Sequence, residues 1–261
     1  MNANLEIDTS SHYIDAMLKD FKMADIRRRY NDLIQTATEK KMGYKEFLAA
    51  LLKAEENGRK ERRTQRYIKN ANFEKIMTLD AYDYGFHKHA NMQIIKELST
   101  LDFLSQKKNV ILIGKPGTGK THVATGIGLK ACEAGRKVLF ENALDLINSL
   151  LKSAREGELK ETLLKLSKID LIIIDELGYL KMDKEKESVF YQLIRSRYEK
   201  GSTIITTNYN LRQWDEIFSS SLAATAILDR LVHHCQIVFM GDEDMGDDSY
   251  RIKGKKEAFG Q

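Results

Sequence analysis

Residues 114–121 carry the clearest chemical signal in the chain, because they follow the G-x-x-x-x-G-K-[ST] pattern of a phosphate-binding loop. Glycines let backbone N–H groups turn inward onto a β-phosphate, at the positive end of the helix that follows. Lys120 brings a positive charge to the β- and γ-phosphates, and the Thr121 hydroxyl is a ligand for Mg²⁺. We therefore expect a Mg²⁺-bound nucleoside triphosphate to contact Gly114, Lys115, Pro116, Gly117, Thr118, Gly119, Lys120, Thr121 and His122.

An acid pair, Asp175 and Glu176, follows an aliphatic run that is typical of a buried strand. An open α/β sheet binds its ligand at the carboxyl ends of its strands. There, Asp175 is expected to hold Mg²⁺ through water, and Glu176 to orient and deprotonate an attacking water. A hydrolase needs such a base. The next strand-like run ends at Asn208, whose amide is a candidate to contact the γ-phosphate or the water.

An arginine can stabilise the charge that develops on the γ-phosphate, and it can come from a neighbouring subunit. Arg230, on a predicted helix, is the candidate for this role, and a surface pair with Asp229 is the alternative. Arg251 is a second candidate for a phosphate or interface contact. Adjacent side chains on a helix point in different directions, so His233 and His234 are not expected to form a metal site.

Beyond residue 107, short aliphatic runs alternate with helical segments. These elements must position the candidate phosphate-binding and catalytic residues. The runs show no polar alternation, as expected for parallel strands that helices cover on both faces. With right-handed crossovers, this pattern predicts an α/β fold, the three-layer sandwich of a P-loop NTPase with a parallel sheet. The expected strands are 109–113, 137–140, 170–174, 202–207 and 236–240.

The amino-terminal part of the chain differs in both pattern and charge. Residues 12–70 lack proline and space apolar residues as a helix does, which predicts a small all-α domain. The net charge is +4, and the first 75 residues hold 16 Lys and Arg against 12 Asp and Glu, so the whole excess lies here. A basic module usually has a polyanion as its partner. We expect a helical DNA-binding domain over 1–70, a linker and entry segment over 71–107, and an ATPase domain over 108–261.

Four arginines in this part follow the spacing i, i+3, i+4, i+7, which puts their guanidinium groups along one face of a helix. If all four touch DNA phosphates, they contribute about −3.6 to the slope of log K against log salt. Such contacts bind duplex DNA with little sequence preference. A merely solvated face is the alternative. The expected DNA contacts are Arg59, Lys60, Arg62, Arg63, Arg66 and Lys69.

The composition excludes a membrane protein and a disulfide-rich secreted domain. Hydrophobic residues make up 42% and charged residues 31%, and the mean hydropathy is −0.44. Aliphatic runs fall far short of the roughly 18 residues of a membrane span, and the first residues do not resemble a signal peptide. Cys132 and Cys235 lack the spacing of a metal site or a disulfide framework. We therefore expect a cytoplasmic protein with reduced thiols.

Several segments together resemble the IstB-like AAA+ ATPases, which are helper proteins of bacterial insertion sequences related to DnaC-type helicase loaders. They are GKPGTGKTHVATGIG, LIIIDELGY, ITTN, LAATAILDRLVHH and GDDSYRIK, in this order. The resemblance implies an AAA+ domain that binds ATP and Mg²⁺, with Gly114–Thr121 as Walker A and Asp175 and Glu176 as Walker B. It implies that Asn208 is sensor 1 and Arg230 the arginine finger. It also implies ATP-dependent self-assembly on double-stranded DNA, target-site selection and stimulation of a transposase.

Two other functions remain open at this point. A helicase loader of the DnaC type would use the amino-terminal domain to grip a helicase rather than DNA. A P-loop phosphotransferase for a small metabolite would need an acceptor pocket and a basic lid, and neither is evident in the sequence. Leu79, Tyr82 and Phe86 are candidates for contact with adenine, and no helical lid is evident after Gly241.

Overall fold

The computed structural model describes residues 10–82, 92–179 and 181–241. The chain divides into two compact units, residues 1–66 and 67–261, although helix α3 (Tyr44–Asn70) continues across the division. Two of the expected contact residues, Phe86 and Arg251, lie outside the described residues.

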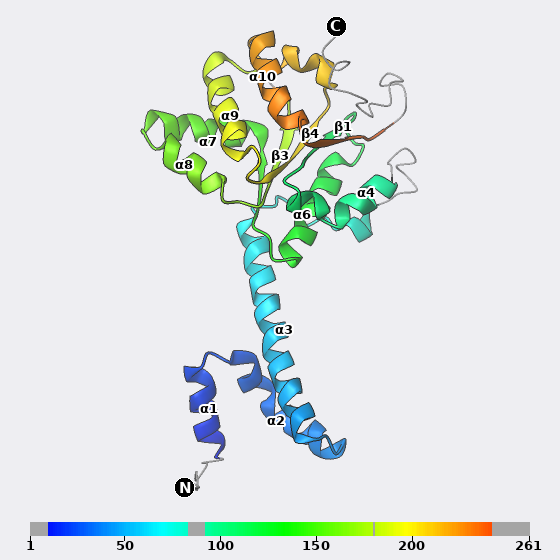
Figure 1. Ribbon diagram of the computed structural model, residues 1–261, viewed down its shortest axis with the longest axis vertical. Helices are drawn as coiled ribbons and strands as arrows, with labels where there is room; N and C mark the ends of the chain where they lie inside the picture. Colours follow the sequence, from blue (N-terminus) through cyan, green and yellow to red (C-terminus); the bar gives the residue numbers. More distant parts are fainter. Residues whose placement is uncertain (1–9, 83–91, 180, 242–261) are drawn as a thin grey trace. The chain divides into compact units, whose positions relative to one another are not determined.

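Within the described residues, the second unit is built on a five-stranded parallel sheet with the order β2-β3-β4-β1-β5 (Figure 1). The predicted parallel sheet is thus confirmed. β1 and β4 have the expected bounds. β3 continues beyond its expected end at residue 174 and includes both acids. The strands are β1 (Asn109–Ile113), β2 (Val138–Asn142), β3 (Leu171–Leu177), β4 (Ser202–Thr207) and β5 (Cys235–Phe239).

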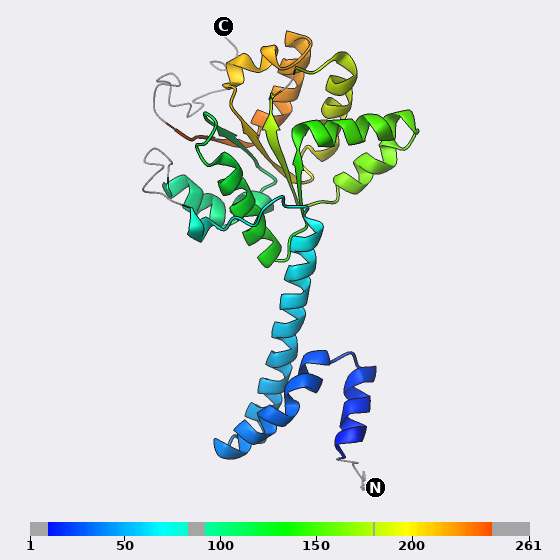
Figure 2. The ribbon, with the colours of Figure 1, turned by 180° about the vertical axis from the view of Figure 1, so that it is seen from behind.

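Successive strand residues point to opposite sides of the sheet, and here the residues on both sides are apolar. Helices therefore cover both faces. Ile172 and Ile174 belong to one buried cluster, whereas Leu171 and Ile173 belong to the other. This arrangement confirms the predicted α/β three-layer sandwich (Figure 2). One face carries α4 (Met92–Ser99), α5 (Asp102–Ser105) and α6 (Lys120–Glu133), and the other carries α7 (Ala143–Arg155), α8 (Leu159–Leu166), α9 (Lys184–Arg197) and α10 (Ser221–Val232).

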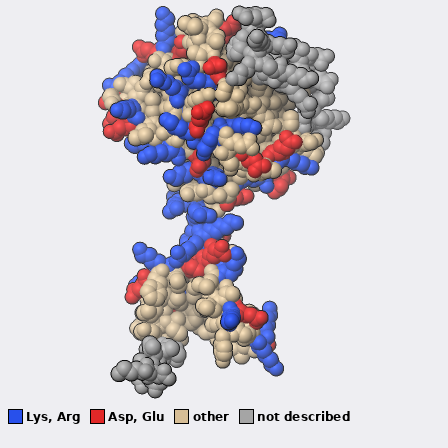
Figure 3. All heavy atoms as spheres, viewed as in Figure 1, with Lys and Arg blue, Asp and Glu red and all other residues tan. Residues whose placement is uncertain are grey.

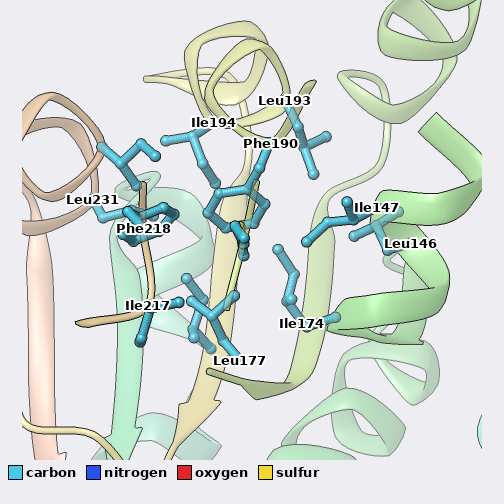
Figure 4. Close-up of a cluster of buried hydrophobic side chains, with 14 of the residues drawn as sticks. Leu146, Ile147, Ile174, Leu177, Phe190, Leu193, Ile194, Ile217, Phe218 and Leu231 are labelled. Atoms are coloured by element: carbon cyan, nitrogen blue, oxygen red, sulfur yellow. The ribbon is translucent and has the colours of Figure 1, made fainter. Parts of the chain in front are cut away.

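A large apolar cluster lies between the sheet and helices α7, α9 and α10 (Figure 4). Phe190 of α9 is fully buried and stacks near Phe218, with ring centroids 6.1 Å apart. Ile174 and Leu177, which flank the acid pair, are also fully buried. Each such side chain stabilises the fold by about 1.5–3 kcal/mol. Burial on both sides therefore holds the acid pair at a defined place on the sheet.

Residues 71–107, expected as a linker and entry segment, belong to the second unit and supply part of its other apolar cluster. Leu79 lies in the short 3₁₀ helix η1 (Leu79–Ala81) and is 6% exposed, and Tyr82 is 4% exposed. Ile95 of α4 is fully buried as well. The described parts of this segment, residues 71–82 and 92–107, therefore pack against α6 and the sheet.

Arg197, at the end of α9, is buried, and the sequence does not distinguish it from its exposed neighbours. Its guanidinium donates to the carbonyl oxygens of Leu166 and Ser202, both at 2.6 Å, and to that of Ile169 at 3.0 Å. Burial lowers the pKa of Arg197 to about 10, so the side chain stays charged at neutral pH. It thus connects the segment before β3 to the start of β4.

The amino-terminal unit is helical, as predicted, with α1 (Ser11–Asp20), α2 (Ala24–Glu39) and most of α3. The buried carboxylate of Glu55 accepts hydrogen bonds from the backbone amides of Asp25 and Ile26, at 2.8 and 3.2 Å. Met23 precedes α2 and has no side-chain cap, so Glu55 supplies the missing acceptor from another helix.

Gly58 allows this contact between α2 and α3. A Cβ atom at residue 58 would lie 2.0 Å from the carboxyl carbon of Asp25, so only glycine leaves room for the buried acid. Glycine within a helix costs about 1 kcal/mol relative to alanine. Close packing of the two helices here offsets that cost.

No helix among the described residues is long and apolar enough to cross a membrane.

Candidate nucleotide-binding site

The predicted phosphate loop connects β1 to α6, whose amino end therefore faces the loop. Gly117 and Gly119 have φ angles of +83° and +84°, in the left-handed region that glycine adopts without strain. The Lys120 ammonium donates to the carbonyl oxygens of Gly114 and Lys115, at 2.7 and 2.9 Å. Burial lowers the pKa of Lys120, and the negative charges of nearby acids oppose this shift only in part.

Thr121 and Asp175, the two expected metal ligands, lie in direct contact. The Thr121 hydroxyl lies 3.0 and 3.1 Å from the two carboxylate oxygens of Asp175, and the Thr206 hydroxyl donates to the same carboxylate at 2.5 Å. Burial raises the pKa of Asp175, and these hydrogen bonds offset part of the rise. Hydroxyl and carboxylate oxygens are the ligands that Mg²⁺ prefers, so this pair fits the ion.

Glu176 leaves the regular strand geometry. Its φ angle is +59°, and the pairing of β3 with β4 shifts register between Ile174 and Leu177. The Glu176 amide donates to the Thr206 hydroxyl at 2.9 Å, which holds the irregular backbone. Consecutive strand residues normally face opposite sides. Here the charges of both acids act on Lys120, and Glu176 is exposed whereas Asp175 is buried.

Asn142, at the end of β2, contacts the Glu176 side chain and was missing from the sequence prediction. Its amide nitrogen donates to a carboxylate oxygen of Glu176 at 3.1 Å, while its amide oxygen accepts from the Leu144 backbone N–H at 2.9 Å. Asn142 therefore caps α7 and orients Glu176 at the same time. The cap is a recognisable sequence signal, but the contact with Glu176 depends on the pairing of β2 with β3.

Of the three candidate adenine contacts, Tyr82 lies beside the loop and Leu79 lies against α6. The Tyr82 hydroxyl lies 3.4 Å from the Thr118 carbonyl oxygen, and the Tyr82 ring meets the His122 ring edge-on at 5.3 Å. A Cβ atom at residue 119 would lie 2.6 Å from the Tyr82 ring, so Gly119 permits this approach. Leu79 packs equally closely against Gly126 of α6. The third candidate, Phe86, lies outside the described residues.

Asn208 follows β4 directly and is exposed at the edge of the sheet that carries the phosphate loop. The Gly114 amide donates to the Thr207 carbonyl oxygen at 3.1 Å, which joins the end of β4 to the start of the loop. The structure thus brings Asn208 to the edge at which a γ-phosphate is expected.

Arg230 lies on the opposite face of the sheet from α6. Its guanidinium donates to the Ala226 carbonyl oxygen at 2.7 Å and lies 4.8 Å from the centre of the Tyr191 ring. It lines a small hollow with Asn109 and Gly201, at the amino ends of β1 and β4, whereas the phosphate loop follows the carboxyl end of β1. The structure therefore does not bring Arg230 to the loop of its own chain.

The four arginines at the spacing i, i+3, i+4, i+7, here called the arginine stripe, lie on α3 and fall into two groups by their contacts. Arg59 donates to Glu55 at 2.7 Å and to the Lys22 carbonyl oxygen at 3.1 Å, and Arg62 forms ion pairs with Asp25 and Glu55. Burial alone would raise the pKa of Glu55, but hydrogen bonds from Arg59 and two backbone amides hold that pKa below its ordinary value. The other predicted DNA contacts, Lys60, Arg63, Arg66 and Lys69, are exposed.

These features define a P-loop nucleotide-binding protein of the AAA+ class. The strand order, the loop between β1 and α6, and the acids at the end of β3 all belong to that class.

The chain belongs to the family of IstB-like ATP binding proteins, whose profile matches residues 16–258. It is 38% identical to the ATP-binding protein of insertion sequence IS21 from Pseudomonas aeruginosa, over 95% of this chain and 91% of that protein. It is 37% identical to the ATP-binding protein of insertion sequence IS5376 from Geobacillus stearothermophilus, over 87% and 89%. ATP is therefore the nucleotide assigned to the loop.

Solved structures share the fold. The DnaC helicase loader is 22% identical, with a TM-score of 0.53 over 67% of this chain and 98% of that one. AMPPCP-bound DnaA from Aquifex aeolicus is 19% identical, with a TM-score of 0.54 over 65% of this chain and 51% of that one.

Proposed function

We propose that this protein is a cytoplasmic, Mg²⁺-dependent ATPase that assembles on duplex DNA and assists the transposase of an insertion sequence. The contact between Thr121 and Asp175, with Glu176 beside it, is the observation that carries the ATPase. The names of the relatives, which belong to insertion sequences, support the role in transposition.

Hydrolysis requires groups that hold the phosphates and a base that activates water. In the proposed reaction Lys120 moves from the loop carbonyls to the β- and γ-phosphates, and Asn208 contacts the γ-phosphate or the water. Thr121 and Asp175 would hold Mg²⁺, which neutralises phosphate charge when bound. Glu176 accepts a proton from the attacking water, whose oxygen forms the new bond to phosphorus as the bond to ADP breaks.

A substitution at Asn142 tests whether Glu176 is the base, because it should change the pH dependence of ATP turnover. We expect Asn142→Asp to shift the acid limb of the ATPase pH profile upward, lowering turnover at pH 6 about tenfold, because two carboxylates in contact share a proton. Aspartate caps a helix as well as asparagine does, so α7 should be unaffected. Asn142→Ser keeps a cap without the charge, and its acid limb should stay in place. Matching profiles for Asn142→Asp and the unmodified chain would contradict the contact.

The proposed DNA contacts lie on the carboxyl-terminal half of α3, where Lys and Arg side chains gather (Figure 3). Arg59 and Arg62 hold the buried carboxylates of the amino-terminal unit, so we assign the main phosphate contacts to the other exposed residues of the predicted set, Lys60, Arg63, Arg66 and Lys69. This is a narrower set than the full stripe, and it still favours binding without sequence preference.

Two double variants separate the groups. Replacing Arg63 and Arg66 by alanine should weaken duplex binding and reduce the magnitude of the salt slope by about 1.8. Replacing Arg59 and Arg62 should instead lower the helical circular dichroism of the amino-terminal unit, because buried carboxylates lose their partners. Fluorescence anisotropy across a salt series measures the slopes.

Unchanged duplex binding after replacement of Arg63 and Arg66, with the helical signal intact, would contradict the DNA assignment. It would favour the DnaC-type loader, in which this unit grips a helicase. ATP turnover measured with and without duplex DNA provides the second readout. We expect duplex DNA to change the rate of turnover.

A further inference from the structure

The end of α10 holds two histidines whose rings come together. α10 ends at Val232, so His233 and His234 lie in the turn before β5 rather than within the helix. Their ring centroids are 4.2 Å apart and their planes meet at 79°. The expectation that adjacent histidines diverge was therefore wrong: His233 keeps helical backbone angles, φ −51° and ψ −41°, but the chain leaves the helix directly after it.

A carboxylate from another element completes the cluster. Glu199 follows α9 and has a φ of +58°. One donor atom from each of Glu199, His233 and His234 lies within 4.8 Å of the others, and all three side chains are exposed. The shortest approach recorded between Glu199 and His234 is 3.8 Å, too long for a hydrogen bond. The three donor atoms thus lie close together without a hydrogen bond between Glu199 and His234.

Tyr198 orients one of the histidines. Its hydroxyl lies 3.1 Å from Nδ1 of His233, and the two rings are also in contact, with centroids 6.0 Å apart. When the tyrosine oxygen accepts the Nδ1 proton, Nε2 of His233 keeps its lone pair for a metal. Metal-bound histidines commonly have such an outer partner on the second ring nitrogen.

We propose that Glu199, His233 and His234 bind a divalent transition-metal ion of the Zn²⁺ type, at a site separate from the phosphate loop. Two imidazoles and one carboxylate match zinc, whereas Mg²⁺ takes oxygen ligands. Zinc bonds of about 2.0–2.2 Å require the donors to move slightly closer, which exposed side chains can do by rotation. The ion would join the end of α9 to the end of α10, the helix that carries Arg230.

Calorimetric titration of the untagged full chain with Zn²⁺, in excess Mg²⁺ to occupy the nucleotide site, tests the proposal. We expect one Zn²⁺ per chain, a rise in Tm with Zn²⁺, and no equivalent rise with further Mg²⁺. The double change of His233 and His234 to alanine should abolish both effects, and Glu199→Gln should weaken binding at least tenfold. Tyr198→Phe should weaken it about 10-fold to 100-fold.

His12→Ala serves as the matched control, because this exposed histidine lies on α1, and it should bind Zn²⁺ as the unmodified chain does. Circular dichroism without metal verifies that each variant is folded. Failure of the unmodified chain to bind Zn²⁺ would overturn the proposal, as would undiminished binding after loss of both histidines or after Glu199→Gln.

Discussion

Glu176→Gln is expected to lower ATP turnover by about two to four orders of magnitude while leaving ATP affinity nearly unchanged. Glutamine has the size of glutamate but cannot accept a proton from water. The phosphate contacts come from the loop and Lys120, which the substitution does not touch. Steady-state turnover and equilibrium binding of a fluorescent ATP analogue measure the two quantities.

The same variant should remain in the ATP-bound assembly, because hydrolysis is the proposed route of release. Size-exclusion chromatography with light scattering, in MgATP and duplex DNA, should show a larger species that persists longer than that of the unmodified chain. Lys120→Ala is the contrasting control, since it should lose ATP binding and assembly together. Turnover at the normal rate by Glu176→Gln would show that another group is the base.

Arg230→Ala should lower ATP turnover about 1,000-fold if this side chain supplies charge to the γ-phosphate of a neighbouring subunit. Arg230 lies on the face away from α6 and toward the amino ends of β1 and β4. In this conformation it therefore cannot contact a γ-phosphate bound in the loop of its own chain. The simpler alternative was a surface pair with Asp229, but the contacts recorded for Arg230 are the Ala226 carbonyl and the Tyr191 ring.

Mixing two inactive variants distinguishes action between subunits from a local structural effect. Arg230→Ala keeps an intact loop and base, and Glu176→Gln keeps the arginine. An equal mixture should therefore recover about a quarter of normal turnover, at interfaces where the two defects complement each other. Asp229→Ala controls for loss of a local pair and should be active. An inactive mixture that still forms mixed oligomers would contradict the role in a neighbouring subunit.

The sequence by itself determined the parallel sheet, the phosphate loop and the acid pair. These features rest on short-range information: an aliphatic run specifies a buried strand, and a loop motif requires its glycines and lysine within eight positions. β1 and β4 have the predicted bounds for this reason.

The tertiary structure decided which partners those groups meet. Arg62 pairs with Asp25 from 37 positions away, which removes part of the predicted basic face. Asn142 reaches Glu176 only because β2 and β3 are neighbours in the sheet, and His233 meets His234 and Glu199 only because α10 ends where it does. Charge and hydrogen-bond partners act through distance in space, and packing rather than local sequence sets that distance.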